Sequence, residues 1–411
     1  MKICMLVYEY PNSLWEAVVS GEIKNPFYLS QALKERGHDI TIVSTSIVTK
    51  RSEKHAKNFN GVKIYNIGDG LFRGIIRYTT RGLKVFEKLL KLTKENHFDL
   101  FHAHSPSLAL GLRFLKKIRM INIPVIITAH GTYIPELDAN IEGFSFYNIL
   151  SKLNGRIQLC IDRFSFSNSD KVISVSNYQI KEMLEIYKIP RKKIAMISNG
   201  VNLSLYRPSP DIGNDIKKKY HIQDRKVVLF VGRLVRKKGV QYLIAAAPYI
   251  LKEIPNTIFL VIGGVDQLSR PSYEPELRRK LRELNLEEKF IFIKNVPEIE
   301  LPALYNAADI CVVPSIDYES IPTVIFESMA CEKPVIATNR WGIFEQIGHE
   351  NSLFPEKDPS IIAKKVVEVL KDKNLSSILS HRNREVIEKF AWDRIAEEHE
   401  KLYKEVLDYE K

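Results

Sequence analysis

Short apolar runs rich in Val and Ile alternate with helix-length amphipathic stretches along the whole chain, and this alternation constrains the fold more than any other feature. Parallel strands need a helical crossover between them, and strands buried on both faces read as nearly continuous apolar runs. The pattern therefore predicts open parallel sheets covered by helices, the doubly wound α/β class. In such folds, ligands bind at the carboxyl edge of the strands.

The alternation occurs in two series. The strand candidates of the first series are Ile3–Tyr8, Asp39–Ser44, Val62–Asn66, Leu100–His102, Val125–Thr128, Lys171–Val175 and Ile194–Ile197. Those of the second are Lys226–Val231, Ile258–Ile262, Phe290–Ile293, Ile310–Pro314 and Pro334–Ala337. The polar stretch 199–215 between them is interrupted by prolines and glycines and reads as a linker. We therefore expect one Rossmann-like domain in residues 1–205 and a second in residues 206–390, with the cleft between them as the default ligand site.

Composition excludes several classes of protein. The 411 residues suit two domains, and no apolar run approaches the roughly 18 residues of a membrane-spanning helix. The N-terminus reads as a first buried strand rather than a signal peptide, so we expect a cytoplasmic protein. Its four cysteines form no Cys-x-x-Cys pair, which argues against a disulfide framework and a zinc site.

The formal net charge of +12 is unevenly distributed. Residues 1–207 carry 30 Lys and Arg against 17 Asp and Glu, a balance of +13, while the rest carries 31 against 32, a balance of −1. The first half therefore either meets phosphates or an anionic membrane, or simply has a solubilising basic surface.

The segment 314–338 combines a strand end, a loop and a helix start. Pro322 suits the first helical position, and the exposed amides of Thr323 and Val324 could then receive a phosphate at the positive end of the helix. Glu327, one turn deeper, could bind vicinal hydroxyls such as those of a ribose, while Glu319 stands in the loop before the helix. The alternative is that both carboxylates are merely solvated.

A second candidate loop follows the strand 226–231. Gly232 would let a ligand approach the backbone, Arg233 offers a bidentate fork, and Lys238 offers a point charge for a diphosphate. Such loops are often only solvated, but this one shares a domain with the Glu319 and Glu327 segment.

In the first half, Gly21 follows Ser20 in a loop that suits phosphate approach, and His130 ends a strand beside Gly131. A strand-end histidine can bond a substrate hydroxyl or move a proton, although a single histidine is more often packed or solvated. His102 and His104 end another strand, and we expect them to line or support the same cleft. No metal-ligand spacing and no Asp-x-Asp pair occurs, so we expect neither a metal nor another cofactor.

Taken together, these segments resemble the family-4 retaining glycosyltransferases, which have the GT-B fold and transfer a sugar from a nucleotide diphosphate donor. The resemblance covers nearly the whole chain and is carried by the Ser-Gly loop, ALKERGHDITIV, DLFHAHS, PVIITAHGT, SDKVISVSNY, ISNGVN, VGRLVRKKGV, LPALYNAADICVVPS, the Glu-x7-Glu segment, CEKPVIAT and FAWDRIAEEHEKLY.

The resemblance implies a role for each candidate residue. Arg233 and Lys238 would neutralise the donor diphosphate, and Glu319 and His130 would contact the donor sugar. Donor binding would also involve Gly21, Gly232, Ser320, Ile321, Thr323, Val324 and Glu327. No protein nucleophile would be needed, and the first domain would bind a sugar or lipid-linked acceptor. The final segment 391–411 would be a helix that crosses back onto the first domain.

A basic stripe in the first half suggests a further partner. Arg73, Arg77, Arg81, Lys84, Lys88 and Lys91 recur at helical spacing. The stripe suits an anionic membrane surface or a lipid-phosphate acceptor, or it is a solvated helix face. It lacks interleaved aromatic residues for stacking, so we expect no nucleic-acid partner. Two other functions stay open: another GT-B nucleotide-sugar enzyme such as an epimerase, and a non-catalytic protein that binds anions or membranes.

Overall fold

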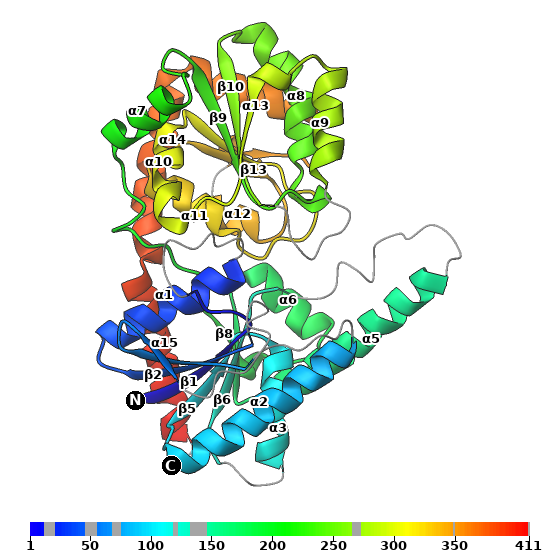
Figure 1. Ribbon diagram of the computed structural model, residues 1–411, viewed down its shortest axis with the longest axis vertical. Helices are drawn as coiled ribbons and strands as arrows, with labels where there is room; N and C mark the ends of the chain where they lie inside the picture. The colour runs from blue at the N-terminus through cyan, green and yellow to red at the C-terminus, as the bar shows by residue number, and fades with distance from the viewer. Residues whose placement is uncertain are drawn as a thin grey trace. The chain divides into compact units, whose positions relative to one another are not determined.

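The structure, a computed structural model, describes residues 1–11, 21–45, 56–67, 75–117, 122–131, 146–264, 273–347 and 350–409 (Figure 1). These residues form two compact units. Unit 1 runs to Asn199 and also contains the last helix, from Trp392 onward, while unit 2 contains Gly200–Ala391. The division lies a few residues before the expected boundary at 205.

Unit 1 is built on an eight-stranded sheet in the order β3-β4-β2-β1-β5-β6-β7-β8. All neighbouring strands pair in parallel except β3 and β4. The strands are β1 (Lys2–Val7), β2 (Asp39–Ser44), β3 (Lys57–Phe59), β4 (Val62–Asn66), β5 (Leu100–Ala103), β6 (Val125–Ala129), β7 (Lys171–Ser174) and β8 (Ile194–Met196). The sequence pattern predicted all of them but β3, a short antiparallel edge strand without an apolar run.

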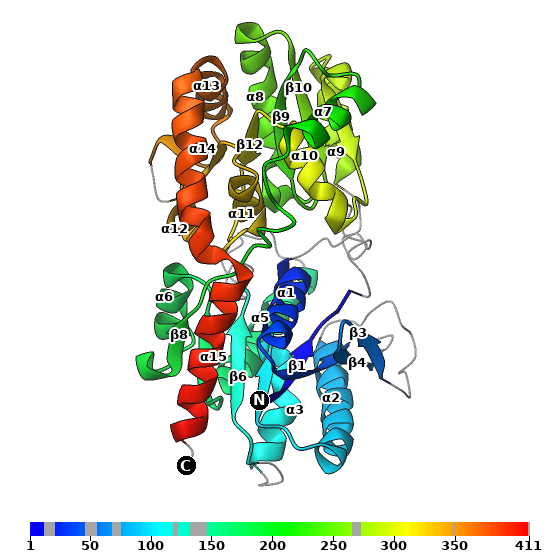
Figure 2. The same cartoon turned by 90° about the vertical axis from the view of Figure 1, so that its left-hand side faces the viewer.

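Helices cover both faces of this sheet. They are α1 (Gly21–Glu35), α2 (Ile75–Glu95), α3 (Pro106–Lys117), α5 (Phe146–Ser167), α6 (Asn177–Glu185) and α15 (Trp392–Tyr409). Helices α2, α3 and α5 contact one another, and α15 lies along α1 (Figure 2). The rings of Tyr28 and Trp392 stack, and Arg36 donates to Glu400 at 2.7 Å. The last helix is therefore an integral part of unit 1.

Unit 2 repeats the architecture with a six-stranded parallel sheet in the order β11-β10-β9-β12-β13-β14. Its strands are β9 (Lys226–Val231), β10 (Thr257–Ile262), β11 (Phe290–Ile293), β12 (Ile310–Val313), β13 (Val335–Thr338) and β14 (Leu353–Phe354). Its helices are α7 (Pro210–Lys219), α8 (Val240–Glu253), α9 (Glu274–Glu283), α10 (Leu301–Ala307), α11 (Thr323–Ala330), α12 (Trp341–Ile347), α13 (Pro359–Lys371) and α14 (Lys373–Ile387). Part of the expected linker, from Pro210 onward, is thus the helix α7.

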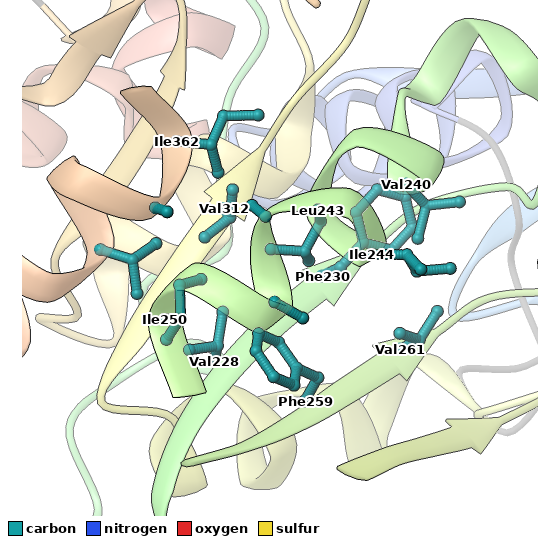
Figure 3. Close-up of a cluster of buried hydrophobic side chains, with 14 of the residues drawn as sticks. Val228, Phe230, Val240, Leu243, Ile244, Ile250, Phe259, Val261, Val312 and Ile362 are labelled. Carbon is teal, nitrogen blue, oxygen red and sulfur yellow. The ribbon is translucent and has the colours of Figure 1, made fainter. Parts of the chain in front are cut away.

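The core of unit 2 shows why these residues form these elements. Helix α8 turns Leu243, Ile244 and Ile250 onto the sheet, where they meet Phe230 of β9 and Phe259 of β10 (Figure 3). Each of these side chains is buried, because every central strand of a parallel sheet is covered on both faces. The packing fixes the strand ends, and so fixes the loops that follow them.

The two units confirm the expected class, parallel-sheet α/β domains in series. The four cysteines carry free thiols, three of them buried. None of the helices in the described ranges is long and apolar enough to cross a membrane.

Candidate active site

The loop after β9 is held against the loop after β12 by backbone contact. Gly239 has a positive φ of 73°, and a Cβ atom there would lie 1.7 Å from the carbonyl oxygen of Pro314. Only glycine fits such a position without moving one of the two loops. The amide of Ile316 also donates to the carbonyl oxygen of Lys237 at 2.9 Å. This contact places Lys238 beside the loop that carries Glu319.

Lys238 and Glu319 form an ion pair. The Nζ atom of Lys238 lies 2.5 Å from Oε1 of Glu319, and the side chains are only 17% and 12% exposed. The hydroxyl of Ser315 also donates to this oxygen, at 3.4 Å. The structure thus brings together two of the predicted site residues as an ion pair in which the two charges offset each other.

Arg233 stands at the carboxyl edge of the sheet, where β9 and β10 end side by side. Gly232 donates to the carbonyl oxygen of Ile262 at 2.9 Å, and a Cβ atom on Gly263 would lie 1.9 Å from the carbonyl oxygen of Gly232. Arg233 therefore belongs to the same loop as Lys238, and both cations follow the end of β9.

Helix α11 begins one residue later than expected. Pro322 is its N-cap, with an extended ψ of 116°, and Thr323 is the first helical residue. The carbonyl of Pro322 accepts from the amide of Ile325, as the carbonyl of an N-cap residue does, and from the Gln346 side chain on α12 at 3.2 Å. The first amides of a helix have no acceptor within it. Those of Thr323 and Val324 are the first two amides of α11, and the binding of an anion to them stays a prediction.

The residues before this helix are buried. Ser320 and Ile321 are 5% and 9% exposed, and the Ser320 hydroxyl donates to the hydroxyl of Tyr318 at 2.9 Å. A Cβ atom on Gly342, in α12, would lie 1.4 Å from the carbonyl oxygen of Ser320. The loop is therefore held at a second point, in addition to the contact between Gly239 and Pro314.

Glu327 is buried rather than presented to solvent, with only 2% exposure. Its Oε2 accepts a 2.7 Å hydrogen bond from the hydroxyl of Tyr305 on α10. Burial and then the negative charge of Glu327 raise the pKa of Tyr305 well above its usual value, so the phenol keeps its proton. Sequence reasoning missed Tyr305, because nothing in the local pattern ties it to a glutamate on another helix.

In unit 1, His130 follows β6 and meets two side chains from other elements. Its Nε2 lies 3.0 Å from Nδ1 of His104, which follows β5, and its Nδ1 lies 3.5 Å from the amide nitrogen of Asn25 on α1. Burial, and then the charge of His399, lower the pKa of His130 to about 4. The ring is therefore neutral at pH 7. Sequence reasoning expected His104 here but missed Asn25.

Gly21 is the first residue of α1. The preceding loop, with Ser20, lies outside the described residues, so phosphate approach at Gly21 stays a prediction. In the described part of the chain, no group of three or more His, Cys, Asp or Glu side chains could hold a metal ion.

Unit 2 by itself offers two cations, helix-end amides and two carboxylates around one sheet edge. Such a set suits a ligand with phosphates and sugar hydroxyls better than an apolar ligand.

Comparison with known proteins agrees with this chemistry. Residues 27–205 match the family model described as glycosyltransferase family 4, and residues 211–386 match the model described as glycosyl transferases group 1. An uncharacterized glycosyltransferase of Methanocaldococcus jannaschii is 28% identical over 99% of each chain.

Among solved structures, sucrose-phosphate synthase from Thermosynechococcus elongatus aligns with a TM-score of 0.83 and 21% identity over the full length of both chains. The Anabaena protein HepE, solved in complex with UDP and glucose, aligns with a TM-score of 0.77 and 18% identity, over 98% of this chain and 99% of that one. These likenesses show that the fold is GT-B.

Proposed function

The chain belongs to the family-4 (group 1) glycosyltransferases, and from this premise we propose that it transfers a sugar from a nucleotide diphosphate-sugar to an acceptor hydroxyl, with retention and without a metal ion. The observation that carries the proposal is the pairing of Lys238 with Glu319 next to the N-terminus of α11. The cation and the carboxylate lie in the adjoining loops that follow β9 and β12, and the second of these loops leads into the first amides of α11. A diphosphate linked to a sugar has the matching charges and hydroxyls.

Each residue of unit 2 has a proposed part in binding the donor. Arg233, Lys238 and the amides of Thr323 and Val324 bind the diphosphate, with Gly232 and the Ser320–Ile321 segment shaping the approach. Glu327 accepts hydrogen bonds from the ribose hydroxyls, and Glu319 from the sugar hydroxyls. The HepE structure, which contains UDP and glucose, supports a donor of this class.

His130 and Gly21, in unit 1, have proposed parts of their own. The neutral ring of His130 is a hydrogen-bond partner for a sugar hydroxyl. Gly21 begins α1 and lets the preceding loop approach a phosphate.

The proposed chemistry needs no protein nucleophile. The bond between the anomeric carbon and the diphosphate oxygen breaks, and a bond from the same face to the acceptor oxygen forms. The acceptor hydroxyl gives its proton to the departing phosphate. Fixed charges and amides that stabilise the leaving diphosphate are then the main source of rate enhancement.

A ligand screen followed by product analysis tests this function. We expect one or a few nucleotide diphosphate-sugars to raise the thermal midpoint, and transfer with a retained anomeric configuration to continue in EDTA. Binding without transfer to any acceptor, but with a changed sugar, would indicate an epimerase. Failure of every nucleotide diphosphate to bind would favour a non-catalytic protein that binds anions.

We also propose that unit 1 associates with an anionic membrane. Leu83 on α2 is 66% exposed and lies between Gly82, which contacts Leu110 of α3, and the exposed Lys84. Leu110 also lines an apolar groove with Ile157, Cys160, Ile161, Phe164 and the exposed Arg156. Apolar side chains among cations suit a lipid surface, where each cation near the surface contributes about 1 kcal/mol.

Two lysines of the basic stripe, Lys88 and Lys91, have partners on the protein. The ammonium group of Lys88 lies over the ring of Tyr65, 4.1 Å from its centre, and Lys91 approaches Glu95 at 3.9 Å. Arg73 and the side chains of Arg77 and Arg81 lie outside the described parts. The stripe is therefore less uniform than its spacing suggests.

Vesicle sedimentation tests the membrane proposal. We expect binding to anionic vesicles at low salt, weaker binding at high salt, and a loss on changing Leu83→Glu together with Lys84→Glu. The matched control is Lys364→Glu on α13 of unit 2, another exposed helix residue. Equal sedimentation with neutral and anionic vesicles would contradict the proposal.

A further inference from the structure

Two histidines at the carboxyl edge of the unit 1 sheet form a bonded pair. The rings of His104 and His130 lie nearly parallel, at 9°, with Nδ1 of His104 facing Nε2 of His130 at 3.0 Å. His104 follows β5 and His130 follows β6, and these strands are neighbours. Two rigid strand ends therefore set the geometry of the pair, which does not depend on a loop.

The contact with Asn25 gives this pair a direction. The Asn25 atom that faces Nδ1 of His130 is its amide nitrogen, which can only donate a hydrogen bond. With the Asn25 amide in this orientation, Nδ1 of His130 accepts. A neutral imidazole has one N–H, so the proton of His130 stands on Nε2 and is donated to Nδ1 of His104.

Behind the pair, a buried polar chain holds His104 in place. The ring of His104 packs on that of His102, with centres 4.3 Å apart. His102 is bonded at Nδ1 to the hydroxyl of Tyr403 on α15 and at Nε2 to the hydroxyl of Thr128, both at 2.7 Å. Helix α15 thus supports the histidine pair through two bonded residues.

Two atoms of this cluster are not explained by packing. Oδ1 of Asn25 and Nε2 of His104 are buried and have no hydrogen-bond partner among the described residues. If Nδ1 of His104 accepts from His130, the single proton of His104 stands on its Nε2. A buried donor without an acceptor costs about 1 to 3 kcal/mol. Leucine would remove that cost but would leave the Nε2–H of His130 without an acceptor, so the histidine at 104 is explained by its bond to His130 rather than by packing.

We propose that His104 is a positioning residue for sugar transfer, which fixes the ring and tautomer of His130 so that Nδ1 of His130 accepts a hydrogen bond from a substrate hydroxyl. The substrate hydroxyl takes the place of the long Asn25 contact. Only the use of this atom in transfer rests on the proposed function, because the geometry of the pair exists without substrate.

The charge state of the cluster supports the assignment. Burial lowers the pKa of His104 well below its usual value, and that of His130 to about 4. His102 and His399 face the pair from β5 and α15, and burial lowers their pKa values as well. All four rings are then neutral at pH 7, and each has a single proton to place.

Nuclear magnetic resonance of the full chain with ¹⁵N-labelled histidine tests the geometry without substrate. We expect His130, assigned by its loss in His130→Gln, to show the Nε2–H tautomer. In His104→Leu its signals should shift or broaden, because its Nε2 loses its acceptor. An Nδ1–H tautomer in the wild type, or unchanged His130 signals in His104→Leu, would overturn the proposal.

Kinetics and stability together test the role in transfer. We expect His104→Leu to lower kcat by about 10- to 100-fold at little change in donor KM, since a small displacement of a substrate-positioning group has effects of this size. Its thermal midpoint should stay near that of the wild type, because the orphaned donor at Nε2 of His104 is gone while the Nε2–H of His130 loses its acceptor. His104→Asn keeps an acceptor at the Nδ1 position and should restore much of the rate.

The control is His97→Leu, an exposed histidine of the same unit that should change neither quantity. A normal kcat in a folded His104→Leu protein would overturn the proposal. If instead the wild-type chain transfers no sugar, the proposed function fails, while the tautomer measurement still decides the geometry of the pair.

Discussion

Nζ of Lys238 and Oε1 of Glu319 lie 2.5 Å apart, so the proposed ligands of the diphosphate and of the donor sugar are bonded to each other. Donor binding must divide this pair, because the lysine is needed at the phosphates and the carboxylate at the sugar hydroxyls. The two residues therefore influence each other's affinity, and single substitutions should not act independently.

This competition predicts opposite effects of one substitution on two ligands. In Glu319→Gln the lysine loses its carboxylate partner, so a nucleoside diphosphate without sugar should bind a few-fold more tightly. The full nucleotide-sugar should bind more weakly, because its sugar loses a charged acceptor. Titration calorimetry with both ligands measures the difference, and weakening of both ligands alike would refute the competition.

The lysine itself should be needed for both ligands. Lys238→Met should weaken the nucleoside diphosphate and the nucleotide-sugar by about 10- to 100-fold, the effect of losing one hydrogen bond to a charged group. The matched control is Lys237→Met, an exposed lysine of the same 3₁₀ turn. Equal affinities of the two variants for either ligand would remove Lys238 from the diphosphate site.

Glu327 should determine whether the site recognises a ribose. The wild type should bind a ribonucleoside diphosphate more tightly than its 2′,3′-dideoxy analogue, and Glu327→Gln should lose most of this preference because a charged acceptor is replaced by a neutral one. Glutamine keeps the shape and an oxygen for the Tyr305 hydroxyl, so this buried position stays filled. Tyr305→Phe serves as the control, and should retain the preference at a cost of about 1 kcal/mol in stability. An unchanged preference in Glu327→Gln would remove Glu327 from the ribose site.

The strands could be predicted from the sequence because a parallel strand buried on both faces must be a short apolar run. The exceptions are short: β3 has three residues and β14 has two, too few to show a periodicity. Local chemistry also placed Arg233, Lys238 and the α11 amides at strand or helix ends, where parallel sheets expose ligand-binding groups.

Contacts between distant residues could not be predicted. Lys238 and Glu319 are 81 residues apart, and Tyr403 and His102 are 301 apart. Such partners are set by how helices pack on the sheet, which a local pattern does not encode. The same holds for the burial of Glu327, because its position in the helix could be predicted but the Tyr305 that covers it could not.

Gly239 should be essential for the position of Lys238. Gly239→Ala places a Cβ atom against the carbonyl oxygen of Pro314 and also strains a left-handed backbone, which alone costs about 1 to 2 kcal/mol. We expect a lower unfolding midpoint and a loss of donor affinity, since the loop must move away from Glu319. The control is Gly82→Ala in α2, where the nearest atom is 3.6 Å away and alanine should be neutral or stabilising. A Gly239→Ala protein with normal donor affinity would contradict the role given to this contact.

Unit 1 should lose stability on mild acidification, and unit 2 should not lose it to the same extent. His38, His102, His104, His130 and His399 all belong to unit 1, and burial lowers the pKa of each below the 6.5 of a free histidine. The two described histidines of unit 2, His221 and His381, are exposed.

As the pH falls below about 6.5, the unfolded chain takes up protons that the folded unit does not, so unfolding becomes more favourable. The stability is present above that pH and is lost progressively down to about pH 4, the folded pKa of His130 and His399. Each histidine contributes up to about 1.4 kcal/mol per pH unit.

Hydrogen exchange at pH 7 and pH 5, corrected for the intrinsic exchange rate, can follow both units in one sample. Peptides from β5, β6 and α15 should lose protection at pH 5, while those from β9 and α8 should change less. His399→Leu should reduce the pH dependence by about one proton, because one buried neutral ring is gone. Equal protection of unit 1 at both pH values would show that its histidines are charged, or are accessible, in the folded chain. If they are charged, Nδ1 of His130 is protonated and cannot accept a hydrogen bond from a substrate hydroxyl.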